Sequence, residues 1–339
     1  MKNSRAIQFN LIKKSVFKVL RDFDVPKRIA AVTAAVMIEG DLRGYKNHGI
    51  ERTFEIINGI EKKTINPLAQ HLVLKDFQAI KIIDGQYGLG HFFARQSMKE
   101  AIKRAKHYGV GVCANINSSH IGILSYYSEL ASHSGCIGIT MSTSSPCVVL
   151  GKSGKKILGT NPISFSLPFY PFHITGDFST AMISRGKILE YLQKNDKFDK
   201  YFGIDKNNKP TKDPQSLLEG GIYSMDGSIK GTLLSLLISV LCGHLIGGDI
   251  NANVKGTRFT DHHPNKGDFF IAFDISKFTS LDKFWDQTFA LAQMIETSGS
   301  DFGIPGKRSF ACKQHNLDKG LVISQNMLTL FKNHNINFS

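Results

Sequence analysis

Apolar residues recur at helical spacing through the first 76 positions of the chain. After Pro26, a residue suited to the first turn of a helix, they stand three or four positions apart at Ile29, Val32 and Val36. Alanines and Thr33 fill the positions between them, so this helix is expected to be buried. We therefore expect residues 1–76 to be helical, in three segments.

Beyond this part the pattern changes to short apolar strands that alternate with helices. This alternation is typical of an α/β core. We expect strands at 79–83, 110–116, 136–142, 162–168 and 268–274, helices at 92–108, 122–134 and 285–297, a buried apolar helix at 233–246, and a polar loop at 203–214. The fold class is therefore α/β (α+β), with a helical N-terminal part.

Charge is the next feature that restricts the function. The 339 residues include 42 Lys and Arg against 28 Asp and Glu, which gives a formal net charge of +14. The basic residues are scattered and form no long arm or aromatic-interleaved RNA-binding motif. A generally basic surface that attracts small anions is the better interpretation, and we expect no nucleic-acid partner.

The five cysteines are odd in number and lack CxxC spacing, which indicates a reducing compartment without disulfides or zinc. The N-terminus has no uninterrupted apolar signal core. The apolar run 233–246 is shorter than a membrane span. We expect a cytoplasmic protein with no membrane partner.

The polar segment from Asp41 to Arg52 is the first candidate site. If residues 46–60 were one helix, His48 and Arg52 would lie four positions apart on one face. An imidazole titrates near neutrality and an arginine binds a carboxylate with two parallel hydrogen bonds, so the pair suits a carboxylate substrate with a neighbouring hydroxyl or oxo group. The alternative is a capped helix start with a surface His and Arg.

The second candidate site is Asn117-Ser118-Ser119-His120, where a predicted strand ends. Ligands of α/β proteins collect at such ends, and a helix that starts at once would present free backbone N–H groups to an anion. The alternative is a Ser-capped helix whose His120 merely packs.

Two further motifs do not indicate a site. The glycines from Gly109 to Ala114 match GxGxxA but open a strand, which argues against a Rossmann fingerprint. The pair His262-His263 lacks a partner at metal-ligand spacing and is interpreted as a solvated turn.

Several motifs, in their order along nearly the whole chain, resemble the type-2 malate/L-lactate dehydrogenase family, which differs from the Rossmann lactate and malate dehydrogenases. The matching residues are Asp41-Leu42-Arg43-Gly44, His48-Gly49, Ser119-His120 with Gly122, Tyr126-Tyr127, Gly159-Thr160-Asn161-Pro162-Ile163, Asp177 with Thr180, Arg185-Gly186-Lys187, Pro210-Thr211-Lys212-Asp213-Pro214, Lys230-Gly231, Phe269-Phe270 with Asp274, and Pro305-Gly306.

The resemblance implies a non-Rossmann oxidoreductase that uses NAD or NADP, is normally a homodimer, and acts on a small anionic 2-oxo or 2-hydroxy acid. It implies His48 as acid/base, with Asn47 beside it, and Arg52 as the carboxylate clamp. In some members the histidine equivalent to His120 is instead proposed as the base. Other implied substrate contacts are Thr160 and Arg43, and the implied cofactor positions are His120, Ile121, Gly122, Asp177, Phe178, Ser179, Lys230 and Gly231.

The same resemblance implies two functional parts. Residues 1–76, joined by residues 300–339, would form a helical part for substrate binding and dimerisation, and residues 77–299 an α/β part that binds NAD(P).

Two residues depart from the family pattern. Asn47 stands where the family commonly has Ser before the catalytic His, and Ile229 stands where it often has His before Lys-Gly. Three alternatives stay open: a 2-oxo acid or cyclic imino acid reductase, a reductase of a sugar-derived oxo acid, and a catalytically silent relative that acts as a binding protein. The choice between NAD and NADP also stays open.

Overall fold

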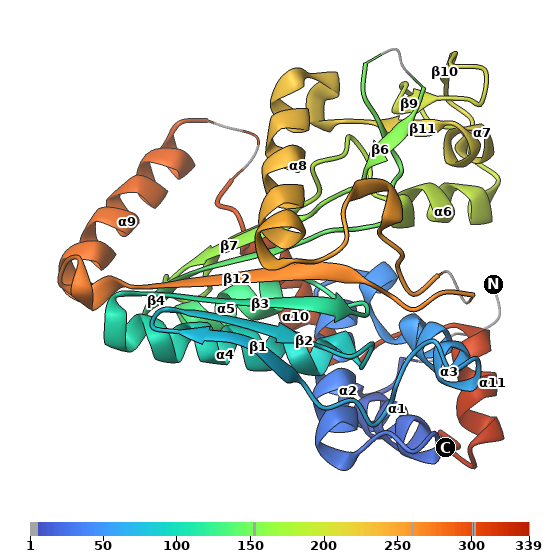
Figure 1. The fold of residues 1–339 in the computed structure, drawn as a ribbon, viewed down its shortest axis with the longest axis horizontal. Helices are drawn as coiled ribbons and strands as arrows, with labels where there is room; N and C mark the ends of the chain where they lie inside the picture. Colours follow the sequence, from blue (N-terminus) through green and yellow to red (C-terminus); the bar gives the residue numbers. More distant parts are fainter. Residues whose placement is uncertain (1–5, 152–153, 259–260, 300, 302, 339) are drawn as a thin grey trace.

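The computed structural model describes residues 6–151, 154–258, 261–299, 301 and 303–338. A twisted seven-stranded sheet forms the centre, with helices against both of its faces (Figure 1). A smaller five-stranded sheet and a group of N- and C-terminal helices lie on separate sides of it (Figure 1).

The N-terminal helices share one apolar core with the end of the chain. Residues such as Ile12, Leu20, Met37 and Phe331 are fully buried there. Ile7 pairs with Leu321 in an isolated β-bridge. The helices are α1 (Phe9–Asp22), α2 (Lys27–Leu42), α3 (Thr53–Glu61), α10 (Lys307–Lys319) and α11 (Gln325–Asn333).

The large sheet has the strand order β1-β2-β3-β12-β4-β7-β8. Only the β2–β3 pairing in it is parallel, and β12 reaches the middle from late in the chain. Helices α4 and α5 pack on one face and α8 on the other. The bounds are β1 (Leu72–Phe77), β2 (Ile80–Asp84), α4 (Gly90–Tyr108), β3 (Val110–Ser118), α5 (Ser125–Ser132), β4 (Cys136–Ser142), β7 (Ile163–Leu167), β8 (Ile174–Phe178), α8 (Ile229–Cys242) and β12 (Lys266–Asp274).

The predicted helical character of residues 1–76 is wrong at its end. Residues 72–77 form strand β1, which pairs antiparallel with β2 through a turn with Gln78 in the left-handed region. A short apolar run next to a tight turn gains more from strand pairing than from one isolated helical turn. The interpretation of Gly109 is confirmed, because this residue ends α4 with φ of 87° and leads directly into β3.

Helix α8 was expected to be buried, and this is correct for one side only. Ile238 and Cys242 pack against the sheet, whereas Leu233, Leu236 and Leu237 are exposed. Together with the short turn that follows, 229–246 is the one helical stretch in the described part that is long and apolar enough to cross a membrane, and 39% of it is buried. This stretch qualifies by length and composition only, and it begins four residues before the expected apolar run 233–246.

The small sheet has the order β10-β9-β11-β5-β6. The expected loop 203–214 contributes two of its strands, because short pairs with a turn between them satisfy the backbone of a polar segment. The remaining bounds are β5 (Val148–Val149), β6 (Lys156–Leu158), α6 (Arg185–Lys194), β9 (Gly203–Ile204), β10 (Pro210–Thr211), α7 (Pro214–Glu219), β11 (Gly221–Tyr223) and α9 (Leu281–Thr297).

Candidate active site

His48 lies in a bent segment that follows α2, and the expected continuous helix through residues 46–60 is wrong. Two 3₁₀ turns, Lys46–His48 and Ile50–Arg52, are separated by Gly49, whose backbone is extended. The carboxylate of Asp41 accepts a hydrogen bond from the backbone N–H of Ile50 (2.8 Å). A Cβ atom on Gly49 would come within 2.2 Å of that carboxylate, so the bend requires glycine here.

The bend brings His48 against His120, which follows β3. Nδ1 of His48 is 3.1 Å from Nε2 of His120, and the two rings stack with centroids 5.2 Å apart. The expected helix after His120 does not start at once, because α5 begins at Ser125. The two candidate segments found in the sequence therefore form one site.

The hydrogen bonds around the two imidazoles assign their protons. The backbone N–H of Gly122 donates to Nδ1 of His120 (3.1 Å), so this nitrogen carries no proton. A neutral His120 then has its proton on Nε2 and donates it to Nδ1 of His48. Neutral His48 is left with a proton on Nε2, which is the nitrogen available for a ligand.

Burial and neighbouring positive charges hold both histidines neutral. Burial, and then the charges of Arg52 and Arg258, lower the pKa of His48 to about 3. Burial also holds the pKa of His120 well below its ordinary value. A third imidazole, His91, is fully buried with its ring centroid 5.7 Å from that of His120, and burial lowers its pKa to about 3.

Arg52 is fixed next to the two histidines. Its Nε donates to the backbone oxygen of Asn47 (2.7 Å), and its Nη1 donates to both carboxylate oxygens of Glu55 (2.7 and 2.6 Å). Nη2 makes no hydrogen bond with any residue that the structure describes, so it is available for an anion. Asn47 binds Arg52 through its backbone oxygen, so this contact does not depend on the type of side chain at position 47.

Two residues near this arginine were missed in the sequence. Glu55, three positions after Arg52, could have been found as an ion-pair partner from spacing alone. Arg258 gives no local signal, because it lies in a turn more than 200 residues away. Its Nε is 3.6 Å from a carboxylate oxygen of Glu55, whose other oxygen accepts from the hydroxyl of Thr257 (2.8 Å).

The hypothesis that Arg43 binds substrate finds no support in its contacts. Its Nε donates to Glu39 (2.7 Å), and its Nη1 and Nη2 donate to the two oxygens of Glu129 (2.6 and 2.5 Å). Lys313 of α10 also binds Glu39 (2.6 Å). Because every guanidinium nitrogen is occupied by a carboxylate, Arg43 ties α2 to α5.

The turn at Thr160 is tied to α8. Its hydroxyl is 3.0 Å from that of Ser144, and the amide of Asn161 donates to the hydroxyls of Ser235 (3.1 Å) and Ser239 (2.8 Å). The structure shows no direct contact between Thr160 and the two histidines, so a role of Thr160 in substrate binding stays a prediction.

The expected cofactor positions fall into three groups. Ile121 and Gly122 are buried directly after His120. Asp177 and Phe178 end β8, and Ser179 follows it; the carboxylate of Asp177 accepts from the backbone N–H of Ser125 (2.8 Å). Lys230 is exposed in the first turn of α8, and Gly231 is closely covered by Met225, where a Cβ atom would approach to 2.6 Å. Among the residues that the structure describes, no hydrogen bond or ion pair joins the three groups directly.

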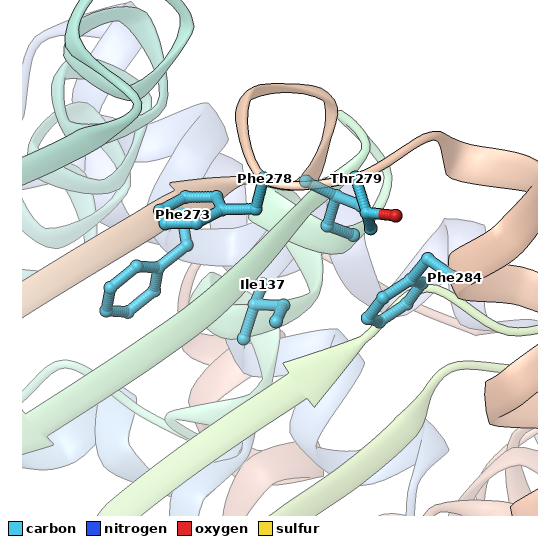
Figure 2. A pocket seen from close by; sticks show the side chains of 6 residues that line it. Ile137, Phe273, Phe278, Thr279 and Phe284 are labelled. Atoms are coloured by element: carbon cyan, nitrogen blue, oxygen red, sulfur yellow. The ribbon is translucent and has the colours of Figure 1, made fainter.

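A hollow of about 160 Å³ lies near the Asp274 end of β12 and is lined mainly by apolar residues, among them Ile137, Phe273, Phe278 and Phe284 (Figure 2). His120 lies at the opposite end of the sheet, where Ser118 pairs with Lys266. The described residues also hold no group of three His, Cys, Asp or Glu side chains arranged for a metal ion.

Comparison with known proteins covers most of the chain. A family model described as malate/L-lactate dehydrogenase matches residues 7–331. The malate/(S)-sulfolactate dehydrogenase of Methanothermus fervidus is 36% identical over 293 residues, which are 86% of this chain and 86% of that protein. The L-sulfolactate dehydrogenase of Methanocaldococcus jannaschii is 37% identical over 324 residues, which are 94% of this chain and 93% of that protein.

A solved structure of the sulfolactate dehydrogenase from Methanocaldococcus jannaschii has the same fold. It superposes with a TM-score of 0.90 at 36% sequence identity and covers 98% of each chain. The mixed α/β fold class expected from the sequence is therefore confirmed.

Proposed function

Because the chain belongs to the malate/L-lactate dehydrogenase family, we propose that it interconverts a small 2-hydroxy acid and its 2-oxo acid with NAD or NADP. It is an oxidoreductase that acts on a CH–OH group. The observation that supports the proposal most directly is the bonded pair His48–His120 next to Arg52.

In the proposed reaction, Nη2 of Arg52 holds the C1 carboxylate of a 2-oxo acid. NAD(P)H, when bound, would supply a hydride to C2. Nε2–H of His48 donates to the C2 oxygen as it becomes an alkoxide, and His120 fixes the orientation of the His48 ring. In the reverse direction the same pair accepts the proton of the hydroxyl.

Substrate binding itself prepares the acid. Burial, and then the charges of Arg52 and Arg258, lower the pKa of His48. A bound carboxylate offsets these two positive charges, and so raises the pKa of His48 towards its ordinary value. The imidazole pair therefore takes up its proton when there is a substrate to receive it.

The expected cofactor positions fit an anionic dinucleotide. Helix α8 begins without a side-chain cap on its N–H groups, and Lys230 is exposed in its first turn. Free N–H groups and a cation together bind phosphate oxygens. We place the cofactor against His120, Ile121 and Gly122, then Asp177, Phe178 and Ser179, and then Lys230 and Gly231. Ile229 stands where the family often has a histidine. It is 67% exposed, so it does not block the proposed cofactor site.

The remaining predictions concern organisation. We propose that residues 1–76 and 300–339 serve substrate binding and residues 77–299 serve NAD(P) binding. A homodimer is supported by β1, an edge strand whose residues are all exposed and include Leu72, Leu74 and Phe77. Light scattering on the purified protein measures the mass, and a monomer at micromolar concentration would contradict the dimer.

Fluorescence titration of the purified protein with NADH and NADPH tests the function. We expect micromolar binding of one of them, followed by oxidation of that cofactor with members of a 2-oxo acid panel. His48→Ala is the control, since it should keep cofactor binding and lose turnover. A folded protein that binds neither cofactor would refute the dehydrogenase proposal and favour the silent relative.

A further inference from the structure

His91 occupies the end of an apolar stripe on α4. The buried positions of this stripe are three or four residues apart, and the other four are Ala94, Met98, Ala101 and Ala105. His91 is fully buried, and neither of its ring nitrogens forms a hydrogen bond with any residue that the structure describes. A buried polar group without a partner is unfavourable, so an imidazole at this position points to a role beyond packing.

The ring of His91 lies against the loop that holds His120. The two ring centroids are 5.7 Å apart, and the ring planes are inclined by 60°. A Cβ atom on Gly122 would come within 3.4 Å of Nε2 of His91, and the backbone N–H of Gly122 is the donor to Nδ1 of His120. The hydroxyl of Ser119 accepts from the backbone N–H of Gly90 (2.7 Å), which ties the start of α4 to the same loop. An unpartnered nitrogen of His91 therefore lies on the side of His120 to which Nδ1 points.

The four ring nitrogens of His48 and His120 limit where protons can go. In the neutral pair, one proton is on Nε2 of His48 and one lies between Nδ1 of His48 and Nε2 of His120. The proton that is added when the pair becomes charged must therefore go to Nδ1 of His120. This nitrogen then stops accepting from Gly122 and needs an acceptor for its own N–H.

The same N–H is needed after the transfer to the substrate. When Nε2 of His48 has given its proton to the C2 oxygen, the proton between the rings moves onto Nδ1 of His48, and Nδ1 of His120 keeps its proton. This neutral form has a lone pair on Nε2 of His48, which accepts the hydroxyl proton in the reverse direction. Both forms of the pair that react with the substrate therefore carry an N–H at Nδ1 of His120.

His91 stays neutral beside this N–H and so keeps a lone pair for it. Burial, and then the charges of Lys266 and Arg52, lower the pKa of His91 to about 3. The charged and titratable groups that act on the rings of His91 and His120 are His48, Arg52, Lys266, which pairs with Asp268, and, through His48, Arg258. The groups that remain charged next to the rings favour a neutral His91.

We propose that a ring nitrogen of His91 accepts the hydrogen bond from Nδ1–H of His120 in both reactive forms of the pair. His91 is then a positioning residue, because it acts on the substrate only through His120 and His48. This inference rests on the proposed function and adds to it the residue that lets the imidazole pair hold its additional proton.

The test compares His91→Phe, which keeps an aromatic ring without nitrogen, with His91→Gln, whose amide oxygen restores an acceptor. The kcat for reduction of a 2-oxo acid by NADH or NADPH is measured between about pH 6 and pH 9. The matched control is His71→Phe, because His71 is exposed and its ring packs against Phe93 of α4. Thermal unfolding and fluorescence titration with the cofactor verify that each variant is folded and binds it.

His91→Phe should lower kcat at about pH 8 by about 5- to 100-fold, which is the effect of one buried N–H without an acceptor. Because this effect disfavours the protonated pair, the upper pH limb of kcat should move down by about one to two pH units. The loss should therefore shrink as the pH is lowered towards about 6. His91→Gln should stay within about threefold of the natural protein, and His71→Phe should match it.

Three results would overturn the inference: an unchanged pH profile in His91→Phe, a loss of the same factor at every pH, or a profile of His91→Gln that is the same as that of His91→Phe. A residue that serves packing alone would give the second result or the third, since phenylalanine fills the space of the imidazole better than glutamine does.

Failure of the proposed function is distinguishable, because it would show as absent cofactor binding and absent turnover in the natural protein. In that case calorimetry with oxamate, whose carboxylate and neighbouring carbonyl resemble those of a 2-oxo acid, is performed in Hepes and in Tris at about pH 7. The difference between the two buffers gives the number of protons taken up with the anion. The natural protein should take up more than His91→Phe, and equal numbers, zero included, would overturn the role of His91.

Discussion

Replacement of Arg43 by Met should destabilise the fold by about 3–5 kcal/mol, the cost of removing one partner from a buried ion pair. The side chain of Arg43 is 10% exposed, and those of its partners Glu129 and Glu39 are 11% and 14% exposed. Glu39 keeps Lys313 in the variant, whereas Glu129 keeps only the hydroxyl of Thr175. The loss in stability therefore comes mainly from Glu129, whose carboxylate stays charged and is largely buried from solvent.

Arg104→Met is a matched control for this prediction. Arg104 is 11% exposed and also pairs with two carboxylates, but Asp76 is 50% exposed and Glu100 is 25% exposed. Water can solvate these two carboxylates after the arginine is removed. Arg104→Met should therefore cost about 1 kcal/mol, close to the value of a surface ion pair.

Thermal and urea unfolding of the two variants give the measurement. Arg43→Met should lower Tm by roughly 5–10 °C, and adding Glu129→Gln should recover part of this loss because it removes the stranded charge. The KM for the substrate should change little in the folded variant. A loss below about 1 kcal/mol together with a large rise in KM would refute this reasoning and return Arg43 to the substrate site.

The remaining predictions concern the site and its supports. His48→Ala should lower kcat by about 10²–10⁴-fold. His120→Ala removes one orienting hydrogen bond and should lower kcat by roughly 5–10-fold. If steady-state kinetics show the larger loss for His120→Ala, the roles of the two histidines are exchanged. The pKa of His91 falls from 6.5 to about 3 on folding, so the stability that its neutral form contributes is complete above pH 6.5 and is lost as the pH falls towards 3. The free energy of unfolding measured with urea should therefore decrease by several kcal/mol, on the order of 4, across this range. The decrease should be smaller in His91→Phe, and a flat profile would contradict the assignment. Asn161→Ala removes the donor to Ser239 and should cost about 1–3 kcal/mol, so an unchanged Tm would show that the turn does not depend on it.

Local patterns were sufficient for most elements of the fold. The apolar spacing in 92–108 and the strand patterns at 136–142 and 268–274 agree with α4, β4 and β12, because periodicity follows directly from which side of an element faces the core. Errors occurred where a neighbour decides the outcome. Residues 72–77 became a strand through pairing with β2, and α8 proved to be covered on one side only.

The sequence alone determined the polar segments at His48 and His120, the fold class and the family resemblance, since these depend on residue types and their order. Only the tertiary structure decided that these histidines, 72 positions apart, share a hydrogen bond. It also showed that Arg43 pairs with Glu129 and that Arg258 lies beside Glu55, the partner of Arg52. The physical reason is that the role of a charged side chain depends on the partners that surround it. These partners come from segments far apart in the chain, and such contacts leave no periodic signal in the sequence.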